Sequence, residues 1–272
     1  MKRFVLMMVF LFDVTFSSAG LAKTLTVANN GTDSPSCGGS GVPCRSISQA
    51  ILNASNGDNV VVGPGEYGNR EFGPATGCCA IVIDKEVSIT ARDGATATVI
   101  NVRDTGRWPV IITASNALFG GKNKGFMVVA DTNPPFSGIF VKEGTSAVTV
   151  QGNTFVGFGR GIDVAGDNGI IANNVVTENG EGLDIHGNNN TAIENIANGN
   201  PGVGGIVVGG NGHVISRNIC NANTFTGIRV TTGSGHQITD NSVIGNGNEG
   251  ILLESGVRAR VTGNSLFATA SN

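Results

Sequence analysis

Charged residues are scarce in this sequence: they make up 14% of its 272 residues, and the formal net charge is −3. It has no basic run, which excludes the electrostatic footprint expected of a nucleic-acid-binding protein. Aromatic residues are also few, with one tryptophan and one tyrosine. No apolar stretch has the length that a membrane-spanning helix needs, so we expect no membrane span.

The N-terminus carries the one long apolar run, and it is too short to cross a bilayer. Lys2 and Arg3 precede the apolar residues 4–12, and small residues follow, with Gly20 and Ala22 suitably placed for cleavage. This order is typical of a secretory signal peptide. We therefore predict a signal peptide at 1–22, cleaved near Ala22, and a secreted or periplasmic single domain at 23–272.

Cysteine is limited to five residues, which an oxidising compartment makes interpretable. Cys37 and Cys44 bracket the glycine-rich loop CGGSGVPC and are predicted to form a local disulfide. Cys78 and Cys79 are adjacent, so their pairing stays open. Cys220 is expected to be a small core residue. No C-x-x-C occurs and the three histidines are scattered, so a zinc site is not expected.

Glycine, in contrast, is abundant at 42 residues, and it marks a repeat. Six rows begin with glycine and an aliphatic residue at intervals of 21 to 23 residues: GIFV at 138, GIDV at 161, GLDI at 182, GIVV at 205, GIRV at 227 and GILL at 250. Each row also carries an asparagine, at Asn153, Asn174, Asn195, Asn218, Asn241 and Asn264, and four rows carry another at Asn179, Asn200, Asn223 and Asn246. A fixed period of this length predicts a solenoid.

The residue types favour a parallel β-helix over a leucine-rich horseshoe. Leucine is scarce, and the apolar positions are mostly valine and isoleucine in short alternating segments, as strands require. Stacked rows would bury columns of like residues. The three columns are Ile139, Ile162, Leu183, Ile206, Ile228 and Ile251; Val141, Val164, Ile185, Val208, Val230 and Leu253; and Phe155, Val176, Ala197, Cys220, Val243 and Leu266.

Both asparagine markers are assigned to structure. Asparagine tolerates left-handed backbone at turns, and stacked amides can bond from row to row. The glycine before each strand is expected to supply a sharp bend.

With these features the chain resembles right-handed parallel β-helix proteins of the pectin-lyase-like superfamily. Residues 44–67 are similar to that family's N-terminal segment, with a short capping helix in the region 44–57, where Ser46 and Gln49 match a capping box. The resemblance implies an all-β solenoid of about nine to ten coils, six of them regular at 138–272. No cap is visible at the other end. Such folds host lyases, hydrolases, epimerases, adhesins and tail spikes.

Polar residues gather at the outward positions of the glycine-led strands. Asp163 and Asp184 fall on consecutive rows, and His186 lies on the same face as Asp184. Two neighbouring carboxylates raise one pKa or recruit a cation, so calcium at Asp163 and Asp184 is a candidate metal site. Lys142 and Arg229 lie one or two rows away. No other cofactor is required.

The segment EGLDIHG resembles the catalytic strand of mannuronan C5-epimerases and related alginate lyases, which reads Y-G-(F/L)-D-P-H-D. The resemblance implies that His186 moves the C5 proton of a uronate and that Asp184 helps to neutralise its carboxylate, assisted by Lys142 or Arg229. The chain departs from the pattern at Glu181, Ile185 and Gly187, and therefore lacks the tyrosine.

Several interpretations of this face stay open. Polygalacturonases and pectate lyases are weaker resemblances, carried by Asp163, Asp184, Arg229 and the pair Gly212 and His213. The enzyme hypothesis predicts a uronate polysaccharide in a groove walled by loops at 66–80 and 103–109. The alternative is a non-catalytic surface or periplasmic β-helix that binds glycan or protein, since a solvated sheet face carries such residues without any function. The glycan and the oligomeric state are not predicted.

Overall fold

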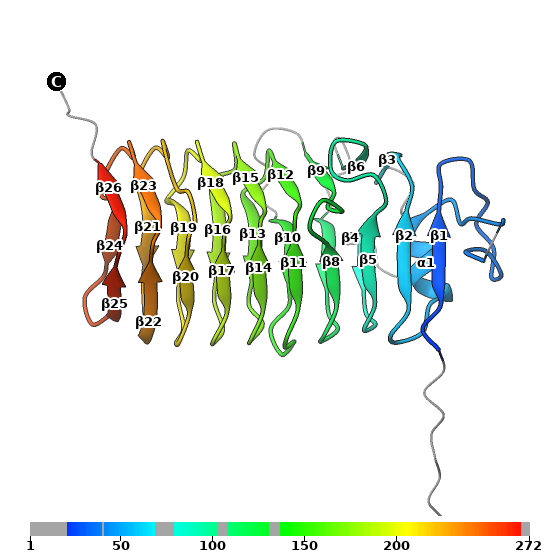
Figure 1. Cartoon of the computed structure of the whole chain (residues 1–272), viewed down its shortest axis with the longest axis horizontal. Coiled ribbons are helices and arrows are strands. Elements are labelled where there is room, and N and C mark those ends of the chain that lie inside the picture. The colour runs from blue at the N-terminus through cyan, green and yellow to red at the C-terminus, as the bar shows by residue number, and fades with distance from the viewer. Residues whose placement is uncertain (1–20, 40, 69–78, 103–107, 131–136, 268–272) are drawn as a thin grey trace, which may run out of the picture.

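The computed structural model describes residues 21–39, 41–68, 79–102, 108–130 and 137–267, so residues 1–20 of the predicted signal peptide lie outside it. The described chain winds through stacked coils into a parallel β-helix, with its N-terminal and C-terminal coils at opposite ends (Figure 1). Each regular coil adds one strand to each of three parallel sheets. The predicted all-β parallel solenoid is confirmed.

The three sheets are named A, B and C. Sheet A contains, in spatial order, β1 (Thr24–Val27), β2 (Asn59–Val62), β5 (Ser88–Ala91), β8 (Leu118–Gly120), β11 (Thr149–Gln151), β14 (Ile170–Ala172), β17 (Thr191–Ile193), β20 (Val214–Ser216), β22 (Ser234–Thr239) and β25 (Arg258–Thr262). Sheet B contains β3 (Gly65–Tyr67), β6 (Thr98–Asn101), β9 (Met127–Val129), β12 (Thr154–Val156), β15 (Val175–Thr177) and β18 (Ile196–Asn198), and single bridges through Ile219 continue it to β23 (Ser242–Ile244) and β26 (Ser265–Phe267). Sheet C contains β4 (Cys79–Ile83), β7 (Trp108–Ile112), β10 (Ser137–Val141), β13 (Arg160–Val164), β16 (Glu181–Ile185), β19 (Gly204–Val208), β21 (Thr226–Val230) and β24 (Ile251–Leu253).

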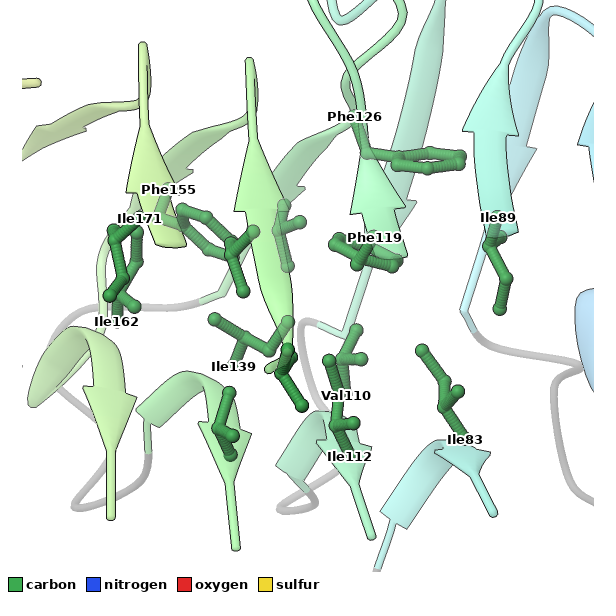
Figure 2. Close-up of a cluster of buried hydrophobic side chains, with 14 of the residues drawn as sticks. Ile83, Ile89, Val110, Ile112, Phe119, Phe126, Ile139, Phe155, Ile162 and Ile171 are labelled. Carbon is green, nitrogen blue, oxygen red and sulfur yellow. The ribbon is translucent and has the colours of Figure 1, made fainter. Parts of the chain in front are cut away.

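The core fills the space between the sheets, and its columns follow the strand register. Ile139, Ile162 and Leu183 are consecutive partners in sheet C, and all three are fully buried. Side chains from all three sheets meet in this core, where Phe119 and Phe126 stack with ring centroids 4.8 Å apart (Figure 2). The three predicted columns are buried except at their last members, Ile251, Leu253 and Leu266, which lie in the last described coil. The column that sheet A contributes was not predicted: Val150, Ile171, Ala192, Ile215 and Ile238.

The asparagines form two buried ladders that run along the solenoid, as the sequence predicted. In the first, Asn174 donates from its backbone N and from Nδ2 to Asn195 Oδ1, both at 3.0 Å, and Asn195 makes the same two bonds to Asn218. The second links Asn179, Asn200, Asn223 and Asn246 in the same way. Each ladder therefore satisfies buried backbone groups at a turn.

Two details of the turn prediction are wrong. The ladder asparagines do not take left-handed backbone; the residue before each of them does, as at Asn173 (φ 55°) and Glu194 (φ 56°). The glycine that leads each sheet C strand supplies space and not a sharp bend. A Cβ on Gly161 would lie 2.1 Å from Val176 Cγ1. No side chain fits there, because this position faces the packed core.

A short helix and a disulfide close the N-terminal end. The helix α1 (Ile47–Asn53) packs on β1, β2 and β4 through its buried face. Ser46 caps it by accepting from Gln49 N, but the Gln49 side chain donates to Asn53 and not back to Ser46, so only half of the predicted capping box forms.

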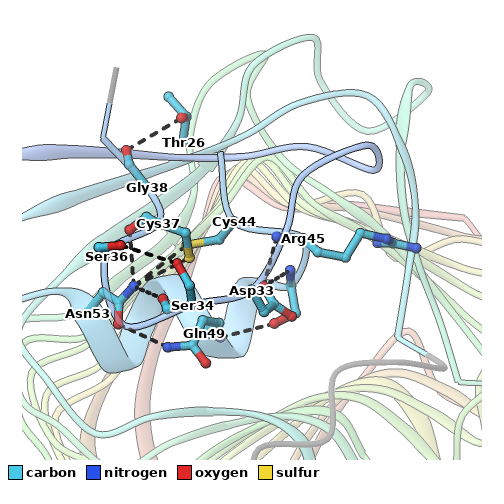
Figure 3. Close-up of a disulfide and its surroundings, with 11 residues drawn as sticks. Thr26, Asp33, Ser34, Ser36, Cys37, Gly38, Cys44, Arg45, Gln49 and Asn53 are labelled. Carbon is cyan, nitrogen blue, oxygen red and sulfur yellow. Dashed lines mark hydrogen bonds between the residues drawn. A yellow bond between two sulfur atoms is a disulfide. The ribbon is translucent and has the colours of Figure 1, made fainter. Parts of the chain in front are cut away.

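The predicted disulfide joins Cys37 and Cys44, and Asn53 Nδ2 donates to Cys37 O at 3.0 Å, which ties the loop to the helix (Figure 3). Cys79 is disulfide-bonded as well, and Cys220 is a free thiol buried in the core, as predicted.

The last described coil leaves apolar side chains exposed at Leu253, Leu266 and Phe267. In the described ranges, no helix has the length and apolarity to cross a membrane.

Candidate functional site

Two buried carboxylates lie side by side on the outer face of sheet C. Asp163 on β13 and Asp184 on β16 are register partners, as the repeat predicted. Only 6% of Asp163 and 3% of Asp184 is exposed, although both point away from the core. Ser137 Oγ on β10 donates to Asp163 Oδ2 at 3.0 Å. Outward carboxylates become buried only when other side chains cover them.

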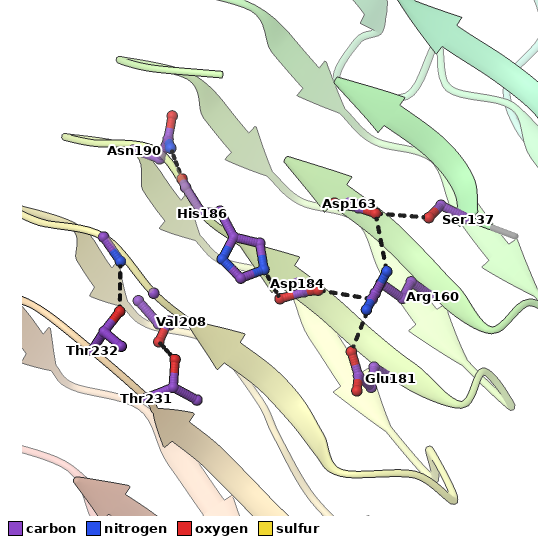
Figure 4. Close-up of polar contacts among 12 residues, drawn as sticks. Ser137, Arg160, Asp163, Glu181, Asp184, His186, Asn190, Val208, Thr231 and Thr232 are labelled. Carbon is purple, nitrogen blue, oxygen red and sulfur yellow. Dashed lines mark hydrogen bonds and ion pairs between the residues drawn. The ribbon is translucent and has the colours of Figure 1, made fainter. Parts of the chain in front are cut away.

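Arg160 provides much of that cover and joins the carboxylates. Its Nε lies 2.8 Å from Asp184 Oδ2 and 3.2 Å from Glu181 Oε2, and its Nη1 lies 3.5 Å from Asp163 Oδ2 (Figure 4). The arginine side chain is 46% exposed, so it remains partly open to solvent. A positive charge therefore sits between two acidic strands, and part of it can still reach a bound anion.

His186 completes the cluster from the other side of Asp184. Its Nε2 lies 2.9 Å from Asp184 Oδ1, and its side chain is 50% exposed. The N–H is poorly aligned, so Asp184 Oδ1 has no donor of good geometry. A Cβ on Gly209, on the next coil, would come within 3.0 Å of His186 Nδ1. Because residue 209 is glycine, the imidazole edge that faces away from Asp184 is not crowded.

The electrostatics of the cluster move two pKa values upward. The contact with Asp184 raises the pKa of His186 above 6.5, because the carboxylate favours the imidazolium. Burial raises the pKa of Asp163 above 3.8, and the neighbouring charge of Asp184 raises it further. Asp184 is thus the carboxylate that holds both the imidazole and the guanidinium, and we name Arg160, Asp163, Glu181, Asp184 and His186 the acid–base cluster.

The Asp184→Asn variant is expected to lower the pKa of His186, because the amide removes the main group that favours the imidazolium. The measurement is an NMR titration of the imidazole protons, assigned with a His186→Ala variant. The matched control is Asp167→Asn, a carboxylate at the turn after β13 that bonds Asn188. An unchanged His186 pKa in Asp184→Asn would contradict the contact.

Arg160 was not predicted as a site residue, because strict strand alternation turns it toward the core. Gly161 and the isoleucine after it both face inward, which breaks the alternation and places Arg160 outside. The sequence does indicate an outward position for Arg160, because the residues directly before the strand glycines form a largely polar column. Its members are Ser137, Arg160, Glu181, Gly204 and Thr226.

Two predicted site residues lie outside the cluster. Val207 stands between Asp184 and Arg229 in the register, so Arg229 is two strands, about 10 Å, from Asp184. Arg229 Nε instead donates to Glu254 Oε1 at 2.7 Å. Lys142 is exposed and follows β10, two coils from His186. The structure therefore brings together Asp163, Asp184 and His186, without Arg229 or Lys142.

The other two histidines are buried in a short third ladder that was not predicted. Asn190 N donates to His213 Nδ1 at 3.1 Å, and His213 stacks on His236 with ring centroids 5.4 Å apart. Each side chain of this ladder also bonds the carbonyl four residues earlier in the sequence: Asn190 bonds His186 O, His213 bonds Gly209 O and His236 bonds Thr232 O. Because His213 Nδ1 accepts, its ring is neutral. The ladder supports the turn that carries His186. The expected turn position is confirmed for His213, whereas His236 lies in β22.

Acid is expected to destabilise this ladder. Burial lowers the pKa of His213 in the folded protein below the 6.5 of an exposed histidine. The unfolded chain therefore binds a proton at a higher pH than the folded protein does. The contribution of neutral His213 to the free energy of unfolding is complete above pH 6.5 and is lost as the pH falls toward the pKa of the folded state. The His213→Asn variant, which repeats the residue type of Asn190 in the same ladder, should lose less stability than wild type between about pH 7 and about pH 5 in urea unfolding. His186→Ala is the opposite control, since the His186 pKa is raised. An equal acid loss in wild type and His213→Asn would contradict this role.

An aromatic pair borders the cluster. Trp108 on β7 and Phe140 on β10 lie with ring centroids 5.3 Å apart and ring planes tilted by 57°. Phe140 is the register partner of Asp163. The single tyrosine, Tyr67, is buried on sheet B and donates to Gly63 O, so it is not part of the site. The predicted walls at 66–80 and 103–109 fall mostly at 69–78 and 103–107, outside the described residues.

Comparison with known proteins places the chain in a family. The family described as "Right handed beta helix region" matches residues 137–272, which is half of the chain and includes the acid–base cluster. The chain belongs to this right-handed β-helix family. No curated protein sequence matches it.

Solved structures share the fold at low identity. The Dettilon tailspike protein matches with a TM-score of 0.66 and 16% identity over 88% of this chain and 50% of its own, so this β-helix spans about half its length. Pectate lyase Pel9A matches with a TM-score of 0.51 and 17% identity over 92% and 78% of the two chains. A mutant of the periplasmic alginate epimerase AlgG matches with a TM-score of 0.50 and 17% identity over 79% and 65%. At these identities the likeness shows the fold alone.

Proposed function

We propose that this β-helix protein is an enzyme that acts on a uronate polysaccharide by moving the proton on C5 of the sugar. One observation carries the proposal: the buried carboxylate of Asp184 holds an imidazole and a guanidinium next to each other on the outer face of sheet C. These are a base and an anion-binding group, the two parts that chemistry beside a carboxylate requires. Structural neighbours of the chain include a pectate lyase and an alginate epimerase.

In the proposed mechanism His186 is the base. Neutral His186 takes the C5 proton on the edge that faces away from Asp184, and Asp184 stabilises the imidazolium that forms. The half-exposed side chain of Arg160 binds the sugar carboxylate and stabilises the negative charge that develops as the proton leaves. Gly209 gives the sugar ring access to the imidazole.

The residues present favour elimination over epimerisation. An epimerase must return a proton to the opposite face of the sugar, and the single tyrosine lies elsewhere. In elimination the C5–H and C4–O bonds break, a C4–C5 double bond forms, and the same imidazole can pass its proton to the departing O4. His186 alone therefore suffices as base and acid in a polysaccharide lyase.

A second candidate is glycoside hydrolysis, and the paired carboxylates favour it. Asp163 and Asp184 lie on adjacent strands in different environments: the pKa of Asp163 is raised, whereas Asp184 faces two cationic groups. Two carboxyl groups in unlike environments serve as the acid and the base of glycosidases. Hydrolysis would produce new reducing ends without a double bond.

Export is part of the proposal. The basic and apolar start of the sequence supports a signal peptide at 1–22. The disulfide between Cys37 and Cys44 supports an oxidising compartment, where a polysaccharide outside the cytoplasm would be met. N-terminal sequencing of the secreted protein tests this, and a start near residue 23 is expected.

The activity test uses polygalacturonate and alginate, each with calcium and with a chelator. Ultraviolet absorbance follows the unsaturated product of a lyase, and a reducing-end assay follows every chain cleavage. Absorbance and reducing ends rising together support elimination, whereas reducing ends alone support hydrolysis. A calcium requirement would support a metal ion at Asp163 and Asp184. Binding of either polymer without any product would favour the non-catalytic alternative.

A further inference from the structure

The outer face of sheet C changes character next to the acid–base cluster. Along one outward column, Val82, Ile111 and Phe140 are register partners on β4, β7 and β10, and the next partner is Asp163. This column is therefore apolar on the N-terminal side and acidic at β13 and β16. Trp108 lies on the apolar side, and its ring is tilted against that of Phe140.

The aromatic pair is held next to the carboxylates by the strand register. Val110 on β7 and Ile139 on β10 are register partners. Trp108 and Ser137 each lie two residues before one of these partners, so they fall in one column across the two strands. Ser137 in turn bonds Asp163. Both aromatic side chains are half-buried, so each leaves part of its ring on the surface. An aromatic surface thus begins one strand from the acid–base cluster.

A sugar ring fits such a border. The faces of a pyranose carry C–H groups that pack on aromatic rings, whereas its edges carry hydroxyls and, in a uronate, the carboxylate. Binding sites for such ligands combine aromatic area with a few placed polar groups. One sugar can lie on the indole while another further along the polymer reaches Arg160 and His186, which lie on and beside β13 and β16, two and three strands from Trp108.

We propose that Trp108 and Phe140 form a sugar-stacking subsite for the polysaccharide, so that the polymer runs along the solenoid axis, across the strands, from the aromatic pair to the acid–base cluster. The inference rests on the proposed function for the position of the reacting sugar. It adds the direction of the polymer and a contact that recognises the sugar's apolar face and not its charge.

The fluorescence of the chain reports this subsite directly, because Trp108 is the only tryptophan. The experiment titrates the His186→Ala variant, which should not degrade the ligand, with a galacturonate hexamer and, separately, with the neutral hexamer of glucose. Tryptophan emission and acrylamide quenching are followed, and calorimetry on the same samples measures binding independently. We expect the galacturonate hexamer to change the emission and to protect Trp108 from acrylamide.

Variants test the energetic contribution. Trp108→Leu and Phe140→Leu in the otherwise wild-type chain are expected to raise KM roughly 2- to 12-fold, the range of an aromatic contact. The fall in kcat/KM should come mostly from KM, and the pH profile of the activity should not change. Phe267→Leu, an exposed phenylalanine in the last coil, is the matched control and should leave KM unchanged. Thermal unfolding of each variant shows whether the solenoid is intact.

The outcomes separate the subsite from the proposed function. Calorimetric binding of the galacturonate hexamer with no change at Trp108 and no loss in Trp108→Leu would overturn the subsite and leave the proposed function standing. Binding of the glucose hexamer alone, with a response at Trp108, would support the subsite and contradict a uronate substrate. No binding of either hexamer would overturn the subsite.

Discussion

The His186→Ala variant is expected to lose about 100- to 10,000-fold in kcat/KM on the uronate polymer that wild type degrades, which is the usual contribution of a positioned general base. The loss follows because His186 is the exposed base of the acid–base cluster: Asp163 and Asp184 are buried, Glu181 is paired with Arg160, and Arg160 stays protonated. Initial rates of unsaturated product formation measure it.

Lys142→Ala is the matched comparison for His186→Ala. Both residues directly follow a strand of sheet C, but Lys142 lies two coils from His186, so its variant should keep most of the activity. Equal losses in the two variants would mean that substrate contacts extend along the column and that His186 is not the base. Full activity in His186→Ala would place the reaction elsewhere on the solenoid.

The Asn195→Ala variant is expected to lose roughly 3–5 kcal/mol of unfolding free energy, because several buried groups lose their partners at once. Asn195 Oδ1 accepts two bonds from Asn174, and Asn195 Nδ2 donates to Ile171 O at 2.8 Å and to Asn218 Oδ1 at 3.0 Å. Ile171, Asn174 and Asn218 are buried, so their polar groups would lose a partner that solvent does not replace.

Urea unfolding measures this loss, with Asn188→Ala as the control. Asn188 also bonds a neighbouring coil, through Asp167, but it is exposed, so water can replace its amide and a change within about 0.5 kcal/mol is expected. Similar losses in both variants would contradict the view that burial of the ladder stabilises the stack.

The sequence predicted the solenoid because its repeat keeps apolar, glycine and asparagine positions in phase over six rows. Strand alternation alone placed Asp163, Asp184 and His186 on one face, and the register confirms that placement. Alternation failed at Arg160, since two consecutive inward residues follow it. For this reason the sequence analysis missed Arg160, the central cation of the site, and predicted Arg229 as the site arginine.

The histidine ladder shows a second limit of the pattern. His213 and His236 read as scattered polar residues in turns, because a histidine that substitutes for a ladder asparagine is visible only when the coils are stacked in register. Their burial and the neutral ring of His213 depend on packing between coils, which no local pattern contains. The same holds for the aromatic pair, whose members are more than thirty residues apart in the sequence.

The fold itself does not select a reaction, since the tailspike, the pectate lyase and the epimerase share it with this chain at 16 to 17% identity. The choice of proton transfer depends on the side chains around Asp184. Hydrolysis would use the same carboxylates without removing a hydrogen from carbon, so the fate of the C5 proton separates the two reactions.

The most direct measurement is proton and deuterium NMR of the polymer products after incubation with the enzyme in deuterium oxide. Elimination through His186 predicts wild-type products whose new terminal sugar has lost its C5 hydrogen to the C4–C5 double bond, and it predicts that His186→Ala forms almost none of them. Cleaved chains that keep every C5 hydrogen and carry no double bond would contradict proton transfer at this cluster.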